Sequence, residues 1–222
     1  MFAYISIHLY LVLYMNLIDD SIKEEVKKNL SQMEDDVEIL FFESGGQFTN
    51  EIKQLISEIS EINSKVKISL NKLGDEKSIY YGIDEGPVLK FLSKHLKGDF
   101  RFYGIPSGYE FATFLYILNT ASNGKVNGPL IDVSKKINKE IKLEVFLSPT
   151  CPHCPSSAIV AFKLAMLNEK VKAYIYEVME FPYKAQKYNV SGVPKTVINE
   201  GQHTYMGGLP EDMASKEIQK TI

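Results

Sequence analysis

Cys151 and Cys154, the two cysteines of the chain, are the residues best suited by type and spacing to do chemistry. They form the motif Cys151-Pro152-His153-Cys154, which follows an apolar run and precedes a helical pattern. Cysteines at this spacing can form a disulfide in the first turn of a helix, and in a strand-to-helix setting the motif is typical of a redox site. The unpaired N–H groups and positive dipole end of the helix favour a thiolate, the attacking species in disulfide exchange.

The spacing predicts a separate role for each residue. Cys151 lies just outside the expected helix and should be exposed, so we assign it as the nucleophile. Cys154 lies inside the first turn and should be shielded, so we assign it to resolve the mixed disulfide. His153 can be cationic and stabilise the thiolate, whereas Pro152 restricts the loop. Pro194 is a second site element, because proline is tolerated in a strand only at an edge or at the first position.

Other interpretations of these residues remain open. The cysteines could form a structural disulfide, although so short a loop constrains little chain. They could be half of a zinc site completed by another chain or by the distant His203, because two cysteines cannot form a four-cysteine site. His153 could be a solvated loop residue without a tuning role. The redox interpretation needs no organic cofactor and no metal, and none is predicted.

The hydrophobic pattern predicts the elements that position the motif, and it occurs twice. In the second half, strand 143–147 precedes the motif, a helix runs from about Pro155 to Glu169, and a strand covers 171–178. The first half repeats this order, and its Tyr81–Pro87 stretch matches Tyr188–Pro194 position for position. The remaining predicted elements are strands 37–42 and 66–70, a helix through 52–62, hairpins 88–92/100–103 and 196–198/203–206, and a terminal helix in each half.

This repeat predicts two tandem units, 15–121 and 129–222, joined by the stretch ASNGKVNGP, which is rich in glycine and asparagine. The element order predicts an α/β fold in which each unit has a mixed sheet of four to five strands flanked by helices. Capping-box spacing predicts helix starts at Ser21 with Glu24, and at Ser107 with Glu110.

Composition supports a folded chain and leaves the N-terminus open. Among 222 residues, 45% are hydrophobic and 24% are charged, and the net charge of −3 argues against nucleic-acid binding. Residues 1–14 begin an apolar run that has neither the basic region nor the cleavage site of a signal peptide. It could be a start-site artefact with Met15 as the true first residue, a packed strand or helix, or a membrane anchor, which we expect least because a spanning helix needs roughly 20 apolar residues.

Four stretches make the chain resemble the archaeal protein disulfide oxidoreductases, or glutaredoxin-like proteins, which have two tandem thioredoxin-fold units. They are SPTCPHCP (148–155), KYNVSGVPK (187–195), KQLISEISE (53–61) and FYGIPSGYEFATFL (102–115). The resemblance implies thioredoxin folds in both units, a cis bond before Pro194 and backbone hydrogen bonds from Val193 to a substrate chain. It also implies a cytoplasmic setting, because such organisms keep disulfides inside the cell.

The chain departs from this family in two places. The family carries a Cys-x-x-Cys in each unit, but here the first unit has Gly46-Gln47-Phe48-Thr49. We therefore interpret that unit as a docking or dimerisation scaffold, or as a unit retained for stability. Thioredoxins also place a buried acid six residues before the first cysteine, where this chain has Val145. Glu144, Glu177 and Glu180 are unproven substitutes, and Glu144 should point to the opposite face of its strand.

Three functions compete. The leading one is a thiol–disulfide oxidoreductase acting on protein thiols or disulfides. The second is an electron carrier between a thioredoxin-reductase-like flavoprotein and a peroxiredoxin, because the N-terminal region of the bacterial alkyl hydroperoxide reductase flavoprotein is similar. The third is a chaperone-like module that binds extended chains without catalysis. We expect no nucleic-acid partner and no membrane partner, and a homodimer remains open.

Overall fold

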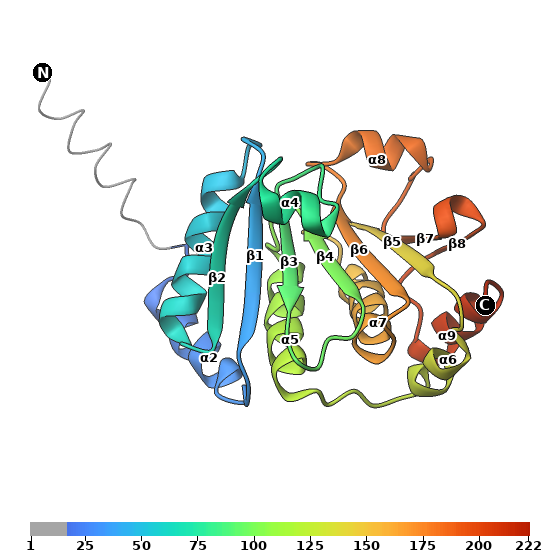
Figure 1. Ribbon diagram of the computed structural model, residues 1–222, viewed down its shortest axis with the longest axis horizontal. Coiled ribbons are helices and arrows are strands. Elements are labelled where there is room, and N and C mark those ends of the chain that lie inside the picture. The colour runs from blue at the N-terminus through green and yellow to red at the C-terminus, as the bar shows by residue number, and fades with distance from the viewer. Residues whose placement is uncertain (1–16) are drawn as a thin grey trace, which may run out of the picture.

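The computed structural model describes residues 17–222 (Figure 1). The predicted extension at 1–14 lies outside the described residues. Among the helices of residues 17–222, none is both long enough and apolar enough to cross a membrane.

The order of elements in the described chain follows the predicted repeat. The first half contains α2 (Asp20–Leu30), β1 (Val37–Glu43), α3 (Thr49–Ile62), β2 (Val66–Lys72), α4 (Glu76–Tyr81), β3 (Val88–Leu92), β4 (Asp99–Tyr103) and α5 (Tyr109–Asn123). The second half contains α6 (Leu130–Lys136), β5 (Ile141–Leu147), α7 (Cys154–Leu167), β6 (Val171–Glu177), α8 (Pro182–Lys187), β7 (Lys195–Ile198), a 3₁₀ turn (Asn199–Gly201), β8 (His203–Met206) and α9 (Glu211–Gln219).

The two halves share one continuous sheet, which the sequence pattern did not predict. Its eight strands are ordered β2-β1-β3-β4-β6-β5-β7-β8, so each half contributes four neighbouring strands. The halves meet where β4 and β6 pair in parallel, with Asp99 opposite Lys172 and Tyr103 opposite Tyr176. Pairing removes two strand edges that would otherwise expose unsatisfied backbone groups. The positions of the two halves are therefore fixed by a backbone ladder.

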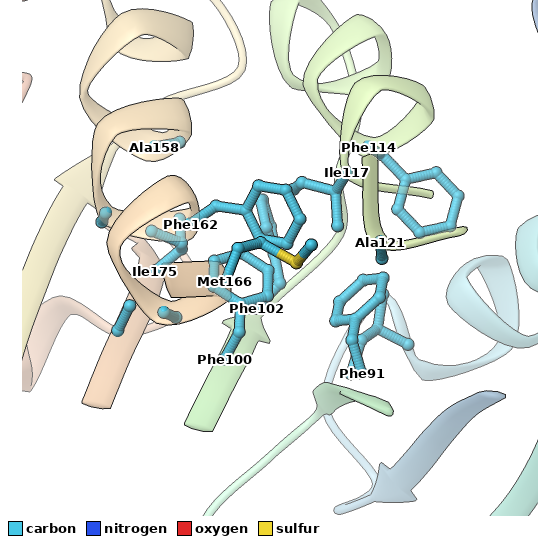
Figure 2. Packing of buried hydrophobic residues seen from close by; sticks show 14 of the residues in the cluster. Phe91, Phe100, Phe102, Phe114, Ile117, Ala121, Ala158, Phe162, Met166 and Ile175 are labelled. Carbon is cyan, nitrogen blue, oxygen red and sulfur yellow. The ribbon is translucent and has the colours of Figure 1, made fainter. Parts of the chain in front are cut away.

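One apolar core lies behind this junction and contains side chains from both halves. Figure 2 shows aromatic rings from the strands meeting rings from α5 and α7. The ring of Phe100 on β4 lies 5.0 Å from the ring of Phe162 on α7 and 5.4 Å from the ring of Phe91 on β3. All three side chains are fully buried. The core of one half therefore continues into the core of the other.

The opposite face of the sheet is covered at the junction by charged and aromatic side chains. Asp99 accepts hydrogen bonds from Lys90 at 2.5 Å, from Arg101 at 2.7 Å and from the Tyr174 hydroxyl at 2.9 Å. The Arg101 guanidinium also lies 4.6 Å from the centre of the Tyr174 ring. Burial by itself would raise the pKa of Asp99, but the hydrogen bonds from Arg101 and the charge of Lys90 outweigh burial and lower it. Since Tyr174 belongs to β6, this network reinforces the β4–β6 pairing.

The capping-box prediction for the first helix is wrong. The cap of α2 is Asp19, whose carboxylate accepts the N–H groups of Ser21 and Ile22 at 2.9 and 3.0 Å. The Asp19 carboxylate, two residues earlier, competes better for these donors than the Ser21 hydroxyl does. The positive end of the helix dipole also stabilises its negative charge.

Candidate functional site

The two cysteines form a disulfide at the start of α7, as the motif predicts. Their Cα atoms are 5.5 Å apart, Cys154 is fully buried and Cys151 is partly exposed. The buried strand β5 ends at Leu147, and the Cys151 N–H then donates to the Ser148 carbonyl at 3.0 Å. This turn presents Cys151 at the surface while Cys154 begins the helix, so only the sulfur of Cys151 can meet a second protein.

His153 and Pro152 are both exposed beside the disulfide. His153 is the residue at which α7 begins, and its carbonyl accepts the Ser156 hydroxyl at 2.8 Å. Within residues 17–222, nothing hydrogen-bonds to the His153 ring. The ring is therefore free to respond to charge on Cys151, and its tuning role stays a prediction.

The loop with Val193 and Pro194 lies against the disulfide. The Cys151 sulfur is 3.6 Å from the Val193 carbonyl oxygen, and the Val193–Pro194 bond is cis, as the resemblance implies. Pro194 is buried, and its carbonyl accepts the Gly207 N–H at 2.8 Å. In the described part of the chain, the N–H of Val193 has no acceptor. That free donor next to Cys151 suits the predicted binding of an extended substrate chain by Val193.

The corresponding place in the first half keeps the backbone shape without sulfur. The Gly86–Pro87 bond is also cis, and a β-carbon on Gly46 would lie 3.1 Å from the Pro87 ring. Thr49 begins α3 as Cys154 begins α7, and it is buried in the same way. No thiol is present at these positions, so no disulfide exchange can take place there.

The prediction that Ser107 caps α5 with Glu110 is also wrong. The helix starts at Tyr109, after Gly108 at φ +58°, and Tyr109 N–H donates to the Pro149 carbonyl at 2.9 Å. A β-carbon on Gly108 would lie 2.3 Å from the same oxygen, so only glycine allows this approach. The start of α5 is thus held by the turn before Cys151, and Glu110 is fully buried instead of folding back as a cap.

Glu110 is the functional candidate that the sequence analysis missed. It is completely buried, and among residues 17–222 neither of its carboxyl oxygens has a hydrogen-bond partner. Burial raises the pKa of Glu110 to about 7, and it outweighs the nearby Thr113 hydroxyl, which acts in the opposite direction. A carboxyl that exchanges its proton near neutral pH, directly after the residue whose N–H is bonded to the Pro149 carbonyl, is suited to proton transfer.

The other acidic candidates have different surroundings. Glu144 is buried on the opposite face from Val145, as predicted, and is paired with Lys142 at 3.1 Å and the Tyr188 hydroxyl at 2.7 Å. Glu177 accepts the N–H groups of Met179 and Glu180 at 3.1 and 2.8 Å. Burial raises the pKa of both Glu177 and Glu180. Glu180 accepts the Ile105 N–H at 2.7 Å, so all three residues have partners that Glu110 lacks among the described residues.

No cluster of three His, Cys, Asp or Glu side chains that could hold a metal ion occurs in residues 17–222. His203, the residue considered for a zinc half-site, forms a 2.6 Å hydrogen bond with Glu217 of α9. Cys151 and Cys154 are bonded to each other in the disulfide.

Replacing Glu110 by glutamine should change how stability depends on pH. The folded-state pKa of about 7, against an ordinary 4.5, means that the folded protein holds this proton more tightly than the unfolded chain. The free energy of unfolding should therefore fall as pH rises from about 4.5 to 7, by roughly 3 kcal/mol at most. Glu110→Gln should lack this fall in urea titrations at pH 5 and pH 8. Glu169 is exposed, so Glu169→Gln should show the same fall as the wild type. If Glu110→Gln showed the same fall between pH 5 and pH 8 as the wild type, the prediction would be contradicted.

Comparison with known proteins agrees with this geometry. A family model described as thioredoxin domain matches residues 141–221. A protein disulfide oxidoreductase from Aeropyrum pernix superposes on 93% of this chain and 94% of its own, with a TM-score of 0.80 and 21% identity, which confirms the predicted tandem thioredoxin fold.

Two curated relatives extend the comparison. The F component of the alkyl hydroperoxide reductase of Escherichia coli is 26% identical over 190 residues, which are 82% of this chain and 34% of that protein. The chain thus spans about a third of the length of that relative. A thioredoxin of Methanocaldococcus jannaschii is 34% identical over 84 residues, which are 37% of this chain and 98% of the relative. Because nearly the whole of that thioredoxin is matched at this identity, the chain belongs to the thioredoxin family.

Proposed function

We propose that the chain is a thiol–disulfide oxidoreductase that acts on protein thiols and disulfides through Cys151 and Cys154. The observation that carries the proposal is the exposed–buried disulfide at the N-terminus of α7, next to the free N–H of Val193. In the reduced form, the Cys151 thiolate attacks a substrate disulfide and releases one substrate thiolate, which takes up a proton. The Cys154 thiolate then attacks Cys151, which releases the second substrate thiol. The substrate gains two electrons from the two cysteines and two protons, one from Cys154 and one from solvent, and the reverse sequence oxidises a substrate dithiol.

The second step requires Cys154 to lose its proton inside the protein, because that thiol is fully buried. Glu110 suits this role, since its surroundings hold its pKa at about 7 and leave it without a competing partner among the described residues. Replacing it by glutamine should lower turnover at pH 7 by about 100-fold. The measurement is the pH profile of kcat for reduction of a protein disulfide. An unchanged profile in Glu110→Gln would remove Glu110 from the mechanism.

The first half supplies a rigid scaffold for this site. Glu85, next to the Gly86–Pro87 bond, accepts hydrogen bonds from Tyr176 at 3.0 Å, from Lys184 at 2.7 Å and from Tyr183. These contacts join its loop to β6 and α8. We divide the chain into units 15–121 and 129–222, the first of which docks substrate or supports a dimer while the second carries the chemistry.

The resemblance to the F component of alkyl hydroperoxide reductase favours a second candidate function. In this second function, a thioredoxin-reductase-like flavoprotein reduces the Cys151–Cys154 disulfide, and the resulting dithiol then reduces a peroxiredoxin. Both functions use the same two cysteines, so they differ in partner and not in chemistry. We place either function in the cytoplasm, on the ground of the archaeal resemblance.

The reduction potential of the Cys151–Cys154 pair, measured by equilibration with glutathione, tests both functions. A value of about −120 to −180 mV, with oxidation of a model dithiol substrate, would identify an oxidant or isomerase. A value of about −270 mV, with peroxide reduction in a mixture with the flavoprotein and peroxiredoxin, would identify the electron carrier. A pair that never turns over with thiols would refute both and leave the binding module.

A further inference from the structure

We propose that Tyr109, which belongs to the first half, contacts the substrate chain beside Cys151 and gives the enzyme a preference for substrates with an apolar residue next to their cysteine. The inference rests on the proposed oxidoreductase function and names the substrate class of the same site. It concerns a residue that lies 42 positions before the reactive cysteine in the sequence and outside the motif-bearing half.

The backbone of Tyr109 is fixed next to the redox turn. Its N–H donates to the carbonyl of Pro149 at 2.9 Å, and Pro149 lies two residues before Cys151. The close approach of Gly108 to the same carbonyl leaves little freedom for the start of α5. The Tyr109 side chain therefore leaves the backbone next to the turn that leads to Cys151.

The side chain of Tyr109 has no evident role in stabilising the fold. It is 53% exposed, and in the described part of the chain its ring stacks on no other ring and its hydroxyl has no hydrogen-bond partner. A large exposed aromatic side chain next to a reactive group offers rigid contact area at a low cost in conformational entropy. The chain contains no tryptophan, so no indole ring can provide such a contact near the disulfide.

A second exposed apolar side chain lies next to the loop that contacts the Cys151 sulfur. Met206 at the end of β8 is 47% exposed, and its methyl group would lie 3.4 Å from a β-carbon on Gly192. Gly192 directly precedes Val193, whose carbonyl is 3.6 Å from the Cys151 sulfur. Tyr109 is thus tied to the turn before Cys151, and Met206 adjoins the Gly192–Val193 loop that contacts its sulfur.

The exposed parts of Tyr109 and Met206 are largely apolar. The occupant that fits this surface is an extended polypeptide segment with an apolar residue beside its cysteine.

Two synthetic peptides test this inference. Each contains one intramolecular disulfide, and they differ only in a phenylalanine or a glycine next to the first cysteine. The wild type should have a KM about tenfold lower for the phenylalanine peptide, as expected when one aromatic contact is made in the complex. Tyr109→Ala should lose this preference, while its kcat and its reduction potential stay at the wild-type values. Tyr109→Phe should retain the preference, because the contact needs the ring and not the hydroxyl.

Tyr80→Ala is the matched control. Tyr80 is 79% exposed in the same half, but it lies on α4, on the opposite face of the sheet from α5 (Figure 1). This variant should keep the preference. The inference is overturned if the wild type does not distinguish the peptides, if Tyr109→Ala still distinguishes them, or if Tyr109→Ala also shifts the reduction potential, which would indicate a structural role. If the wild type reduces neither peptide nor a small disulfide, the proposed function itself fails, and the inference fails with it.

Discussion

Cys151→Ser should abolish turnover of protein disulfides, with a loss of at least about 1,000-fold. The reason is that Cys151 carries the only sulfur of the described pair that reaches the surface, because Cys154 is fully buried. A serine hydroxyl is not ionised near neutral pH and cannot form a mixed disulfide, so no alternative nucleophile remains. The measurement is the rate of insulin reduction or dithiol oxidation, together with a circular dichroism spectrum to show that the variant is folded.

Cys154→Ser provides the matched control for this experiment. It keeps the exposed nucleophile but removes the resolving thiol, so it should accumulate a stable mixed disulfide with substrate that mass spectrometry detects. Cys151→Ser should accumulate none. If Cys151→Ser turned over at the wild-type rate, the assigned nucleophile would be wrong. If substrate binding survived in both variants while neither wild type nor variant showed exchange, the chain would be a binding module.

Phe100→Ala should cost about 3–5 kcal/mol of folding stability. Phe100 is fully buried on β4, and its ring contacts Phe162 of the second half and Phe91 of the first. Figure 2 shows the Phe100 ring among side chains of both halves, so removing it should leave a cavity that both halves line, and close-packed neighbours close such a cavity only in part. The loss should therefore appear as a lower urea midpoint of one transition shared by both halves.

Tyr80→Ala is again the control, because an exposed ring should change stability by no more than about 0.5 kcal/mol. The expectation for Phe100→Ala would be contradicted by two separate unfolding transitions of which one keeps its wild-type midpoint. That result would mean that the β4–β6 ladder and the shared core do not couple the two halves.

Local sequence signals were sufficient to predict the redox turn. The motif lies between an apolar strand and a helical pattern, and both are set by residues within one or two turns of the cysteines. In the structure Cys151 is partly exposed and Cys154 is buried, and the cis bond before Pro194 that the family resemblance implies is present. Such features depend on short-range backbone geometry, which the order of residues determines directly.

The capping predictions show where local reasoning fails. Ser107 and Glu110 have the spacing of a capping box, yet Glu110 is buried and Tyr109 begins the helix. The competing interaction is the contact between Gly108 and the Pro149 carbonyl, which joins two segments about 40 residues apart in the chain. No pattern within the first half contains information about that partner.

The sequence by itself determined the repeat, the α/β class, and the identity and exposure of the two cysteines, because hydrophobic periodicity and the helix start act over a few residues. Only the tertiary structure decided that β4 pairs with β6 to form one sheet, that Tyr109 is bonded to the redox turn of the other half, and that Glu110 is buried. Those placements arise because the edges of β4 and β6 each need a pairing partner and because the apolar faces of the two halves must be buried. The requirement for burial is visible in the sequence, but the partner that satisfies it is selected by packing between distant segments.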